Sequence, residues 1–121
     1  MDKLPEFRVT LTRLQEGEQA YPIGGDVPHY EYDGRRTKLG GDPHYSQYDH
    51  APPKCSRCKK AMTFVAQIDS VEHDWRSNPH RVDCLAEPKK GQKKWMFGDV
   101  GMIYVFFCFD CLEPWAGFEC G

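Results

Sequence analysis

Two C-x-x-C pairs constrain this 121-residue chain more than any other feature of its sequence. They occupy residues 55–58 (CSRC) and 108–111 (CFDC). A C-x-x-C turn directs two sulfur atoms at one point, and a second pair completes the four soft ligands that Zn²⁺ binds in a tetrahedron. A closed tetrathiolate leaves no position for a substrate water. The spacing therefore predicts one structural Zn²⁺ per chain, held by Cys55, Cys58, Cys108 and Cys111.

The surroundings of the first pair agree with a buried anionic centre. Lys54, Arg57, Lys59 and Lys60 flank it, and they can offset the charge of a tetrathiolate and favour deprotonated cysteines. However, 49 residues separate Cys58 from Cys108, which is longer than the roughly 15–20 of a compact zinc ribbon, so the intervening chain must contain an insertion. Reduced structural cysteines, a redox-active dithiol and rubredoxin-like iron are the alternatives.

The other two cysteines, Cys84 and Cys120, have no partner pair in the sequence. Buried free thiols are common in proteins. We expect both to be unligated, with a mutual pairing or a role around the metal as the alternatives.

Hydrophobic patterning predicts a mostly β fold with small α content, in which the cysteine site is inserted in an antiparallel sheet. Residues 6–14 alternate apolar and polar side chains, as a half-buried strand does. Residues 102–109 are apolar on both faces and should lie in the middle of the sheet, paired as a hairpin with 95–97 through a glycine-bearing turn. The predicted strands are 6–14, 61–69 (a central strand), 95–97, 102–109 and 115–120.

Length and charge favour one domain spanning residues 1–121. Within it, residues 1–36 would hold the first strand and a Gly/Pro/Tyr-rich segment, and residues 37–121 the zinc-binding core. The first residues lack the apolar stretch of a secretory signal, and no run is long enough to span a membrane. We therefore expect a cytoplasmic protein that does not bind membranes. The formal net charge of −2 argues against bulk attraction to nucleic acid.

A short motif occurs twice, at 24–33 (GGDVPHYEYD) and 40–49 (GGDPHYSQYD). The simplest interpretation is a pair of similar Gly-Pro turns. A functional alternative is two exposed loops that bind a protein partner through aromatic side chains, because tyrosine is a good interface anchor. The candidate residues are His29, Tyr30, His44 and Tyr45.

The strongest basic cluster is residues 89–95 (KKGQKKW), which ends in Lys93, Lys94 and Trp95. Lysines followed by an aromatic ring can hold phosphates and stack a base. A solvated loop is the simpler interpretation, and nucleic-acid binding through this loop stays an alternative function.

No residue pattern indicates catalysis. His73 and His80 are single histidines in polar surroundings, without a metalloprotease motif or a nucleophile in a recognisable arrangement. We therefore expect the protein not to be an enzyme.

Several motifs in succession resemble the TYPP group, which includes the YwqG-like proteins and the programmed cell death protein 2 family. The resemblance covers about residues 38–120. Tyr45 stands where the group usually has tryptophan, and Glu119 where glutamine is common. The similar segments are 38–47 (KLGGDPHYSQ), 53–58 (PKCSRC), 62–67 (MTFVAQ) and 98–106 (GDVGMIYVF), followed by Cys108 and Cys111.

The resemblance implies a β-rich domain that holds zinc in its cysteine-bearing members and has no known catalysis. Eukaryotic members are chaperones of a small-subunit ribosomal protein, and some bacterial members have been linked to toxin immunity. On this basis we expect a zinc-binding protein-interaction module that acts as a chaperone-like or immunity-like factor.

Overall fold

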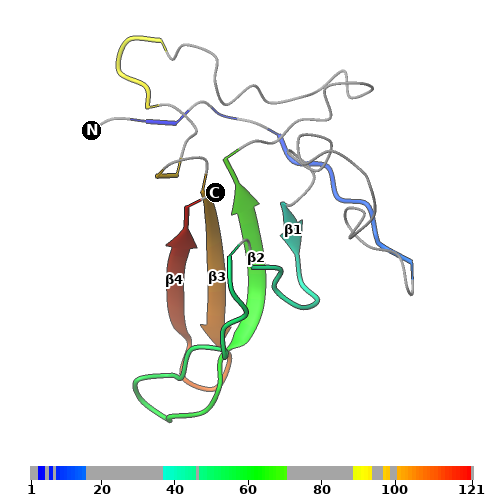
Figure 1. Cartoon of the computed structure of the whole chain (residues 1–121), viewed down its shortest axis with the longest axis vertical. Coiled ribbons are helices and arrows are strands. Elements are labelled where there is room, and N and C mark those ends of the chain that lie inside the picture. The colour runs from blue at the N-terminus through cyan, green and yellow to red at the C-terminus, as the bar shows by residue number, and fades with distance from the viewer. Residues whose placement is uncertain are drawn as a thin grey trace.

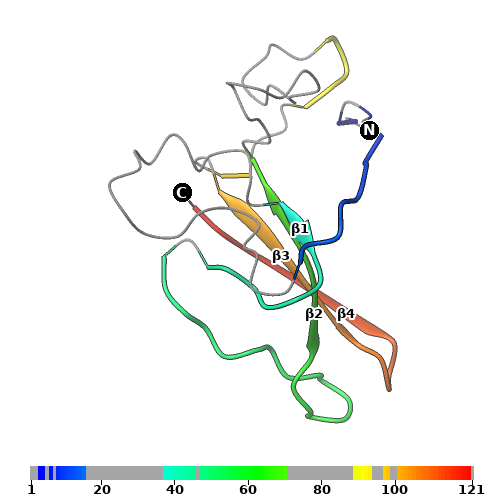
Figure 2. The ribbon, with the colours of Figure 1, turned by 90° about the vertical axis from the view of Figure 1, so that its right-hand side faces the viewer.

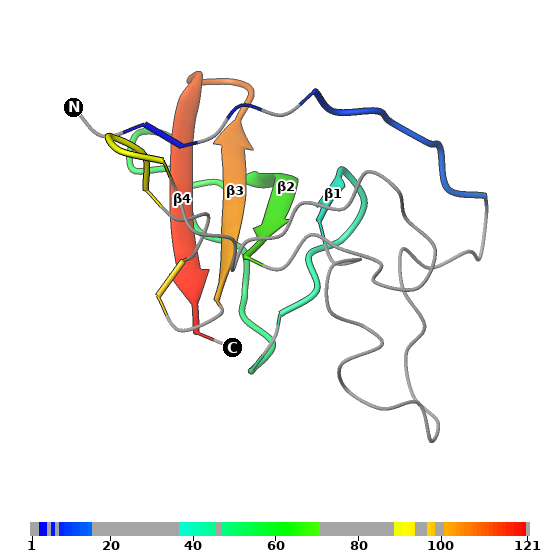
Figure 3. The same cartoon turned by 90° about the horizontal axis from the view of Figure 1, so that it is seen from above.

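A single antiparallel sheet carries the fold. The computed structural model describes residues 3–4, 6, 8–15, 37–45, 47–70, 89–93, 97–98 and 101–120. The strands follow one another across the sheet in the order β1-β2-β3-β4 (Figures 1 and 3). No helix occurs among these residues, so none there could cross a membrane. The strands are β1 (Lys38–Leu39), β2 (Thr63–Asp69), β3 (Met102–Cys108) and β4 (Glu113–Glu119).

The two inner strands confirm the sequence prediction. β2 lies within the predicted strand 61–69, and β3 lies within 102–109. They pair antiparallel, from Thr63 opposite Phe107 to Asp69 opposite Met102. β3 is buried or half-buried along its whole length, because strands pair with it on both sides and its apolar residues face both surfaces of the sheet. The last predicted strand is confirmed as β4, which begins two residues earlier.

Two predicted strands are wrong. Of 6–14, the described residues 6 and 8–14 form no strand, and Val9 and Leu11 are largely exposed, so an alternating pattern occurs here without a sheet to bury it. The predicted hairpin partner of 102–109 is also wrong, because β2 and β4 occupy both edges of β3; of 95–97, only Phe97 lies within the described residues, and it is not in a strand. Phe97 instead accepts a hydrogen bond from the Gly101 N–H (2.7 Å) in a tight turn.

A β-bulge in β2 decides which of its side chains face the core. The pairing with β3 shifts between Phe64 and Ala66. In a regular strand, residues three apart lie on opposite faces. The extra residue places Phe64 opposite Phe106 and Gln67 opposite Tyr104, which are both on the covered face of β3.

The buried Gln67 holds residues 40–62, called the covering segment below, against one face of the sheet. Its Oε1 accepts a hydrogen bond from the His44 N–H (2.8 Å), and the Tyr104 hydroxyl donates to the His44 carbonyl (3.2 Å). Figure 2 shows this segment running along one face of the sheet. Covering a polar backbone in this way requires such partners, since an unpaired buried amide costs about 1–3 kcal/mol.

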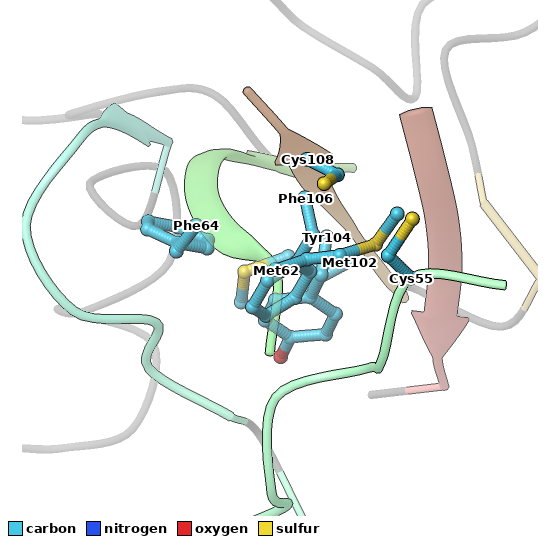
Figure 4. Close-up of a cluster of buried hydrophobic side chains, with 7 residues drawn as sticks. All are labelled: Cys55, Met62, Phe64, Met102, Tyr104, Phe106 and Cys108. Carbon is cyan, nitrogen blue, oxygen red and sulfur yellow. The ribbon is translucent and has the colours of Figure 1, made fainter. Parts of the chain in front are cut away.

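The core lies between the covered face and this segment, and the cysteine site closes one end of it (Figure 4). Phe106 is 1% exposed and contacts the rings of Phe64 and Trp115 edge-on, at centroid distances of 5.5 and 5.7 Å. The buried cluster consists of Cys55, Met62, Phe64, Met102, Tyr104, Phe106 and Cys108.

Several predictions fall outside the described residues. The Gly/Pro/Tyr-rich segment is not described between 16 and 36, which includes the first copy of the repeated motif. The proposed division of the domain at residue 37 therefore stays a prediction.

The burial of Phe106 and the exposure of Phe109 predict a large difference between the effects of replacing them. Phe106→Ala should lower the free energy of unfolding by about 3–5 kcal/mol, because it leaves a cavity between two aromatic rings. Phe109→Ala is the matched control: that side chain is 65% exposed, and the change should stay within about 0.5 kcal/mol. Urea denaturation of the metal-loaded variants measures both, and equal losses would contradict the assigned core.

Candidate metal centre

The two C-x-x-C pairs lie at the same end of the sheet, where two turns meet (Figure 1). The first turn, 55–60, is closed by a bridge between Lys54 and Ala61 just before β2. The second turn joins β3 to β4, and Cys108 pairs with Glu113 across it. Because β2 and β3 are antiparallel neighbours, the start of β2 lies beside the end of β3. The two turns therefore meet at one end of the sheet.

The four sulfur atoms are arranged closely enough to hold a metal ion. The Sγ atoms of Cys55, Cys58, Cys108 and Cys111 all lie within 4.8 Å of one another. The Cys58 and Cys108 Sγ atoms are 3.7 Å apart. A tetrahedron with metal–sulfur bonds of about 2.3 Å has edges of about 3.8 Å, whereas a disulfide would need about 2.05 Å. All four cysteines are free thiols, and their sulfur–sulfur distances fit metal coordination rather than disulfide bonds.

Each turn uses a left-handed residue directly after its second cysteine. Lys59 has φ 64° and Leu112 has φ 58°, and they are the non-glycine residues with positive φ in the described chain. In the first turn, this conformation lets the Lys59 N–H bond the Cys55 carbonyl (2.9 Å) while the Arg57 N–H points at the Cys55 Sγ (3.4 Å). The left-handed conformation thus occurs at the same position after each C-x-x-C pair, although neither lysine nor leucine indicates it in the sequence.

Two ion pairs join one turn to the other. The Arg57 guanidinium contacts the Glu113 carboxylate at 3.2 Å, and the Lys60 ammonium contacts Asp110 at 3.3 Å. The basic side chains of the first turn thus face acidic side chains of the second. Exposed pairs of this kind contribute roughly 0–1 kcal/mol each, so they align the turns more than they stabilise them. Two of the four basic residues predicted to flank the site, Arg57 and Lys60, therefore form ion pairs with the other turn.

The cysteine pKa values diverge because the sulfurs share protons and backbone donors. The Cys58 N–H, together with the Arg57 N–H and neighbouring thiols, lowers the pKa of Cys55 to about 7 despite its burial. Burial, followed by hydrogen bonding to the other three thiols, raises the pKa of Cys111 to about 12. At Cys108 the Cys111 N–H lowers the pKa, but burial and the neighbouring thiols outweigh it and raise the pKa overall. A bound metal ion would displace the protons of Cys108 and Cys111.

The site is closed rather than open. Cys55 is fully buried and Cys108 is 5% exposed, while Cys58 and Cys111 are half-buried. Four thiols converging on one point satisfy the tetrahedral coordination of a structural metal without an added ligand. A metal ion held by all four sulfurs would connect the two turns at this end of the sheet.

Of the other two cysteines, the structure describes only Cys120, which does not belong to this cluster. Cys120 is free and half-buried at the far end of β4 from the turns. Cys84 lies outside the described residues.

The predicted partner-binding residues are only partly described, and no arrangement of them into one site follows. Tyr45 packs on Tyr104, with a centroid distance of 4.9 Å, and the backbone of the adjacent His44 holds the covering segment. Lys93 bonds the Lys3 carbonyl through its N–H (2.8 Å), beyond the opposite end of the sheet from the cysteines (Figure 1). His29, Tyr30, Lys94 and Trp95 lie outside the described residues.

Comparison with known proteins yields no match among family models, curated proteins or solved structures.

The turn geometry predicts that glycine is better than leucine after the second C-x-x-C. Leu112→Gly should raise the free energy of unfolding by up to about 1 kcal/mol, because it removes left-handed strain of about 1–2 kcal/mol at a side chain that is 70% exposed. Phe109→Gly, in the same turn but without a positive φ, should instead be destabilising. Thermal unfolding of metal-loaded protein tests the pair, and destabilisation by both would refute the assigned strain.

Proposed function

We propose that the chain is a non-catalytic zinc-binding protein whose task is to recognise a protein partner. The observation that carries the metal assignment is the convergence of four cysteine sulfurs from two turns within 4.8 Å. Tetrahedral all-sulfur sites suit zinc or iron, and zinc fits a role without redox change. The resemblance to the TYPP group supports the same metal and a chaperone-like or immunity-like role.

Burial favours a structural metal over a redox-active dithiol. A reactive cysteine combines a lowered pKa with access to its reaction partner. Cys55 has the lowered pKa, but its side chain is fully buried. Its low pKa is better suited to metal binding, in which the thiolate is the ligand.

Exposed apolar side chains beside the metal centre support partner recognition. Phe109 and Leu112, on the second turn, are 65% and 70% exposed. Trp115, near the start of β4, is also exposed. Neighbouring exposed apolar groups often mark interaction sites, and aromatic residues are frequent anchors there. A structural metal would hold Phe109 and Leu112 in fixed positions, because both belong to the turn that supplies Cys108 and Cys111.

Metal analysis tests the zinc assignment. Purified protein should contain about one zinc per chain, and Cys58→Ser should lose it because a tetrathiolate needs all four sulfurs. Cys120→Ser is the matched control and should retain the metal, since Cys120 is outside the cluster. Chelation should lower the melting temperature, because binding of structural zinc is worth about 10–16 kcal/mol. Iron in place of zinc, an unaffected Cys58→Ser protein or an unchanged melting temperature would contradict a structural zinc.

Affinity capture from the native host tests partner recognition. The wild-type protein should retain a specific protein that the double variant Phe109→Ser, Leu112→Ser no longer retains, although the variant keeps its zinc. Val9→Ser is the control for loss of an exposed apolar side chain elsewhere, since Val9 is 75% exposed. Capture of the same proteins by all variants, or of nucleic acid alone, would argue against the proposed surface.

A further inference from the structure

An aromatic pocket lies between the covering segment and β4, at a distance along the strands from the metal turns. Its volume is about 390 Å³, within the range of roughly 300–1,000 Å³ that small-ligand sites occupy. Aromatic side chains from the covering segment and the covered face line it, namely those of Tyr45, Tyr104, Phe106 and Trp115, with His50 and Glu119 as its ionisable residues.

Gly117 leaves space for the Trp115 indole, which belongs to the pocket wall on β4. A Cβ at this position would lie 2.4 Å from the Trp115 ring, so the indole folds directly over the glycine. Gly117 also stands opposite Tyr104 in the pairing of β3 and β4. The Phe106 ring contacts the indole edge-on, yet Trp115 stays 43% exposed. The pocket therefore contains an indole that is partly exposed to solvent and is held in place by its neighbours.

A carboxylate supplies the charge of the pocket. The Glu119 side chain is 11% exposed, and its Oε1 lies 2.5 Å from the His50 Nε2. Glu119 and Asp49 both act, after burial, to raise the pKa of the Tyr45 phenol, which is what a negative potential in this region would do. The pocket thus has the Glu119 carboxylate beside its aromatic residues, with Asp49 nearby.

The hydrogen bonds of Glu119 restrict the kind of cation that suits this pocket. Its Oε2 accepts from the Gln47 N–H (3.2 Å) and from the Tyr104 hydroxyl (3.2 Å), while Oε1 is engaged with His50. A guanidinium binds best to a carboxylate with two available oxygens, and a primary ammonium brings three donors that need acceptors. A methylated ammonium needs charge and aromatic faces but no acceptor.

We propose that this pocket binds a quaternary ammonium group, with the cation against Trp115 and the tyrosines and with Glu119 as the nearby counter-charge. The group can come from a small molecule of the choline type or from a trimethylated lysine of another protein. The inference does not depend on zinc, because none of the pocket residues is a cysteine. It shares Trp115 with the exposed surface proposed above, but it does not involve Phe109 or Leu112, the two residues that the partner-capture test changes.

NMR titration tests the ligand class. Choline and tetramethylammonium should shift the resonances of Trp115, Tyr45 and Tyr104, whereas dimethylbutanol, the neutral carbon isostere of choline, should bind at least about tenfold more weakly. A short peptide with trimethyllysine, compared with the same peptide with lysine, separates the two sources. Tighter binding of the methylated peptide than of choline indicates a protein source, and the reverse indicates a small molecule.

Matched variants test the site itself. Trp115→Leu and Glu119→Gln should each weaken choline binding by about tenfold. Phe109→Leu and Glu113→Gln, an aromatic and an acid outside the pocket, should leave it unchanged. Asp49→Asn lowers the negative charge without touching the Glu119 hydrogen bonds, so it serves if Glu119→Gln does not fold. The proposal would be overturned if choline caused no shifts, if the neutral isostere bound as tightly as choline, or if the peptide with unmodified lysine bound more tightly than the methylated one. It would also be overturned if Trp115→Leu and a folded acid variant, either Glu119→Gln or Asp49→Asn, both kept full affinity for choline.

Discussion

The antiparallel pairing of β2 with β3 is the interaction on which the rest of the structure depends. It places the start of one strand beside the end of the other, so turns 49 residues apart in sequence converge. A sheet of three long strands and one short strand has a limited core, and the cysteines close the end where the apolar cluster would otherwise open to solvent. The cysteine centre and the sheet are thus one structural unit, in which Cys55 and Cys108 belong to the core as well as to the site.

The covering segment is the second half of that unit. It crosses one face of the sheet without forming a long strand, so its backbone depends on side chains for partners. Gln67 and Tyr104 supply two of these, and the bulge in β2 is what puts Gln67 on the correct face. The same segment forms one wall of the aromatic pocket, while β4 forms the other. The hydrogen bonds that hold the covering segment on the sheet therefore also position one wall of the aromatic pocket.

Much of the sheet could be predicted because its strands are strongly apolar. The run 102–108 has no charged side chain and no glycine or proline, which identified an inner strand, and 63–69 also lacks glycine and proline. The prediction failed where a local pattern had no neighbour to satisfy it. Val9 and Leu11 alternate like a strand but remain exposed, and 95–97 could not pair with β3 because β4 took that edge. Strand partners depend on the whole topology, which local periodicity does not encode.

For the site, the sequence by itself determined the four metal-ligand candidates, since the spacing within each C-x-x-C pair forces two sulfurs together wherever the turn lies. Tertiary structure decided how the pairs meet, which lysine or arginine faces which acid across the turns, and that Lys59 and Leu112 adopt the left-handed conformation. It also assembled the aromatic pocket, whose residues come from a loop and two strands and share no motif. Short-range geometry follows from covalent spacing, whereas contacts between distant residues exist only once strand order and burial have been settled.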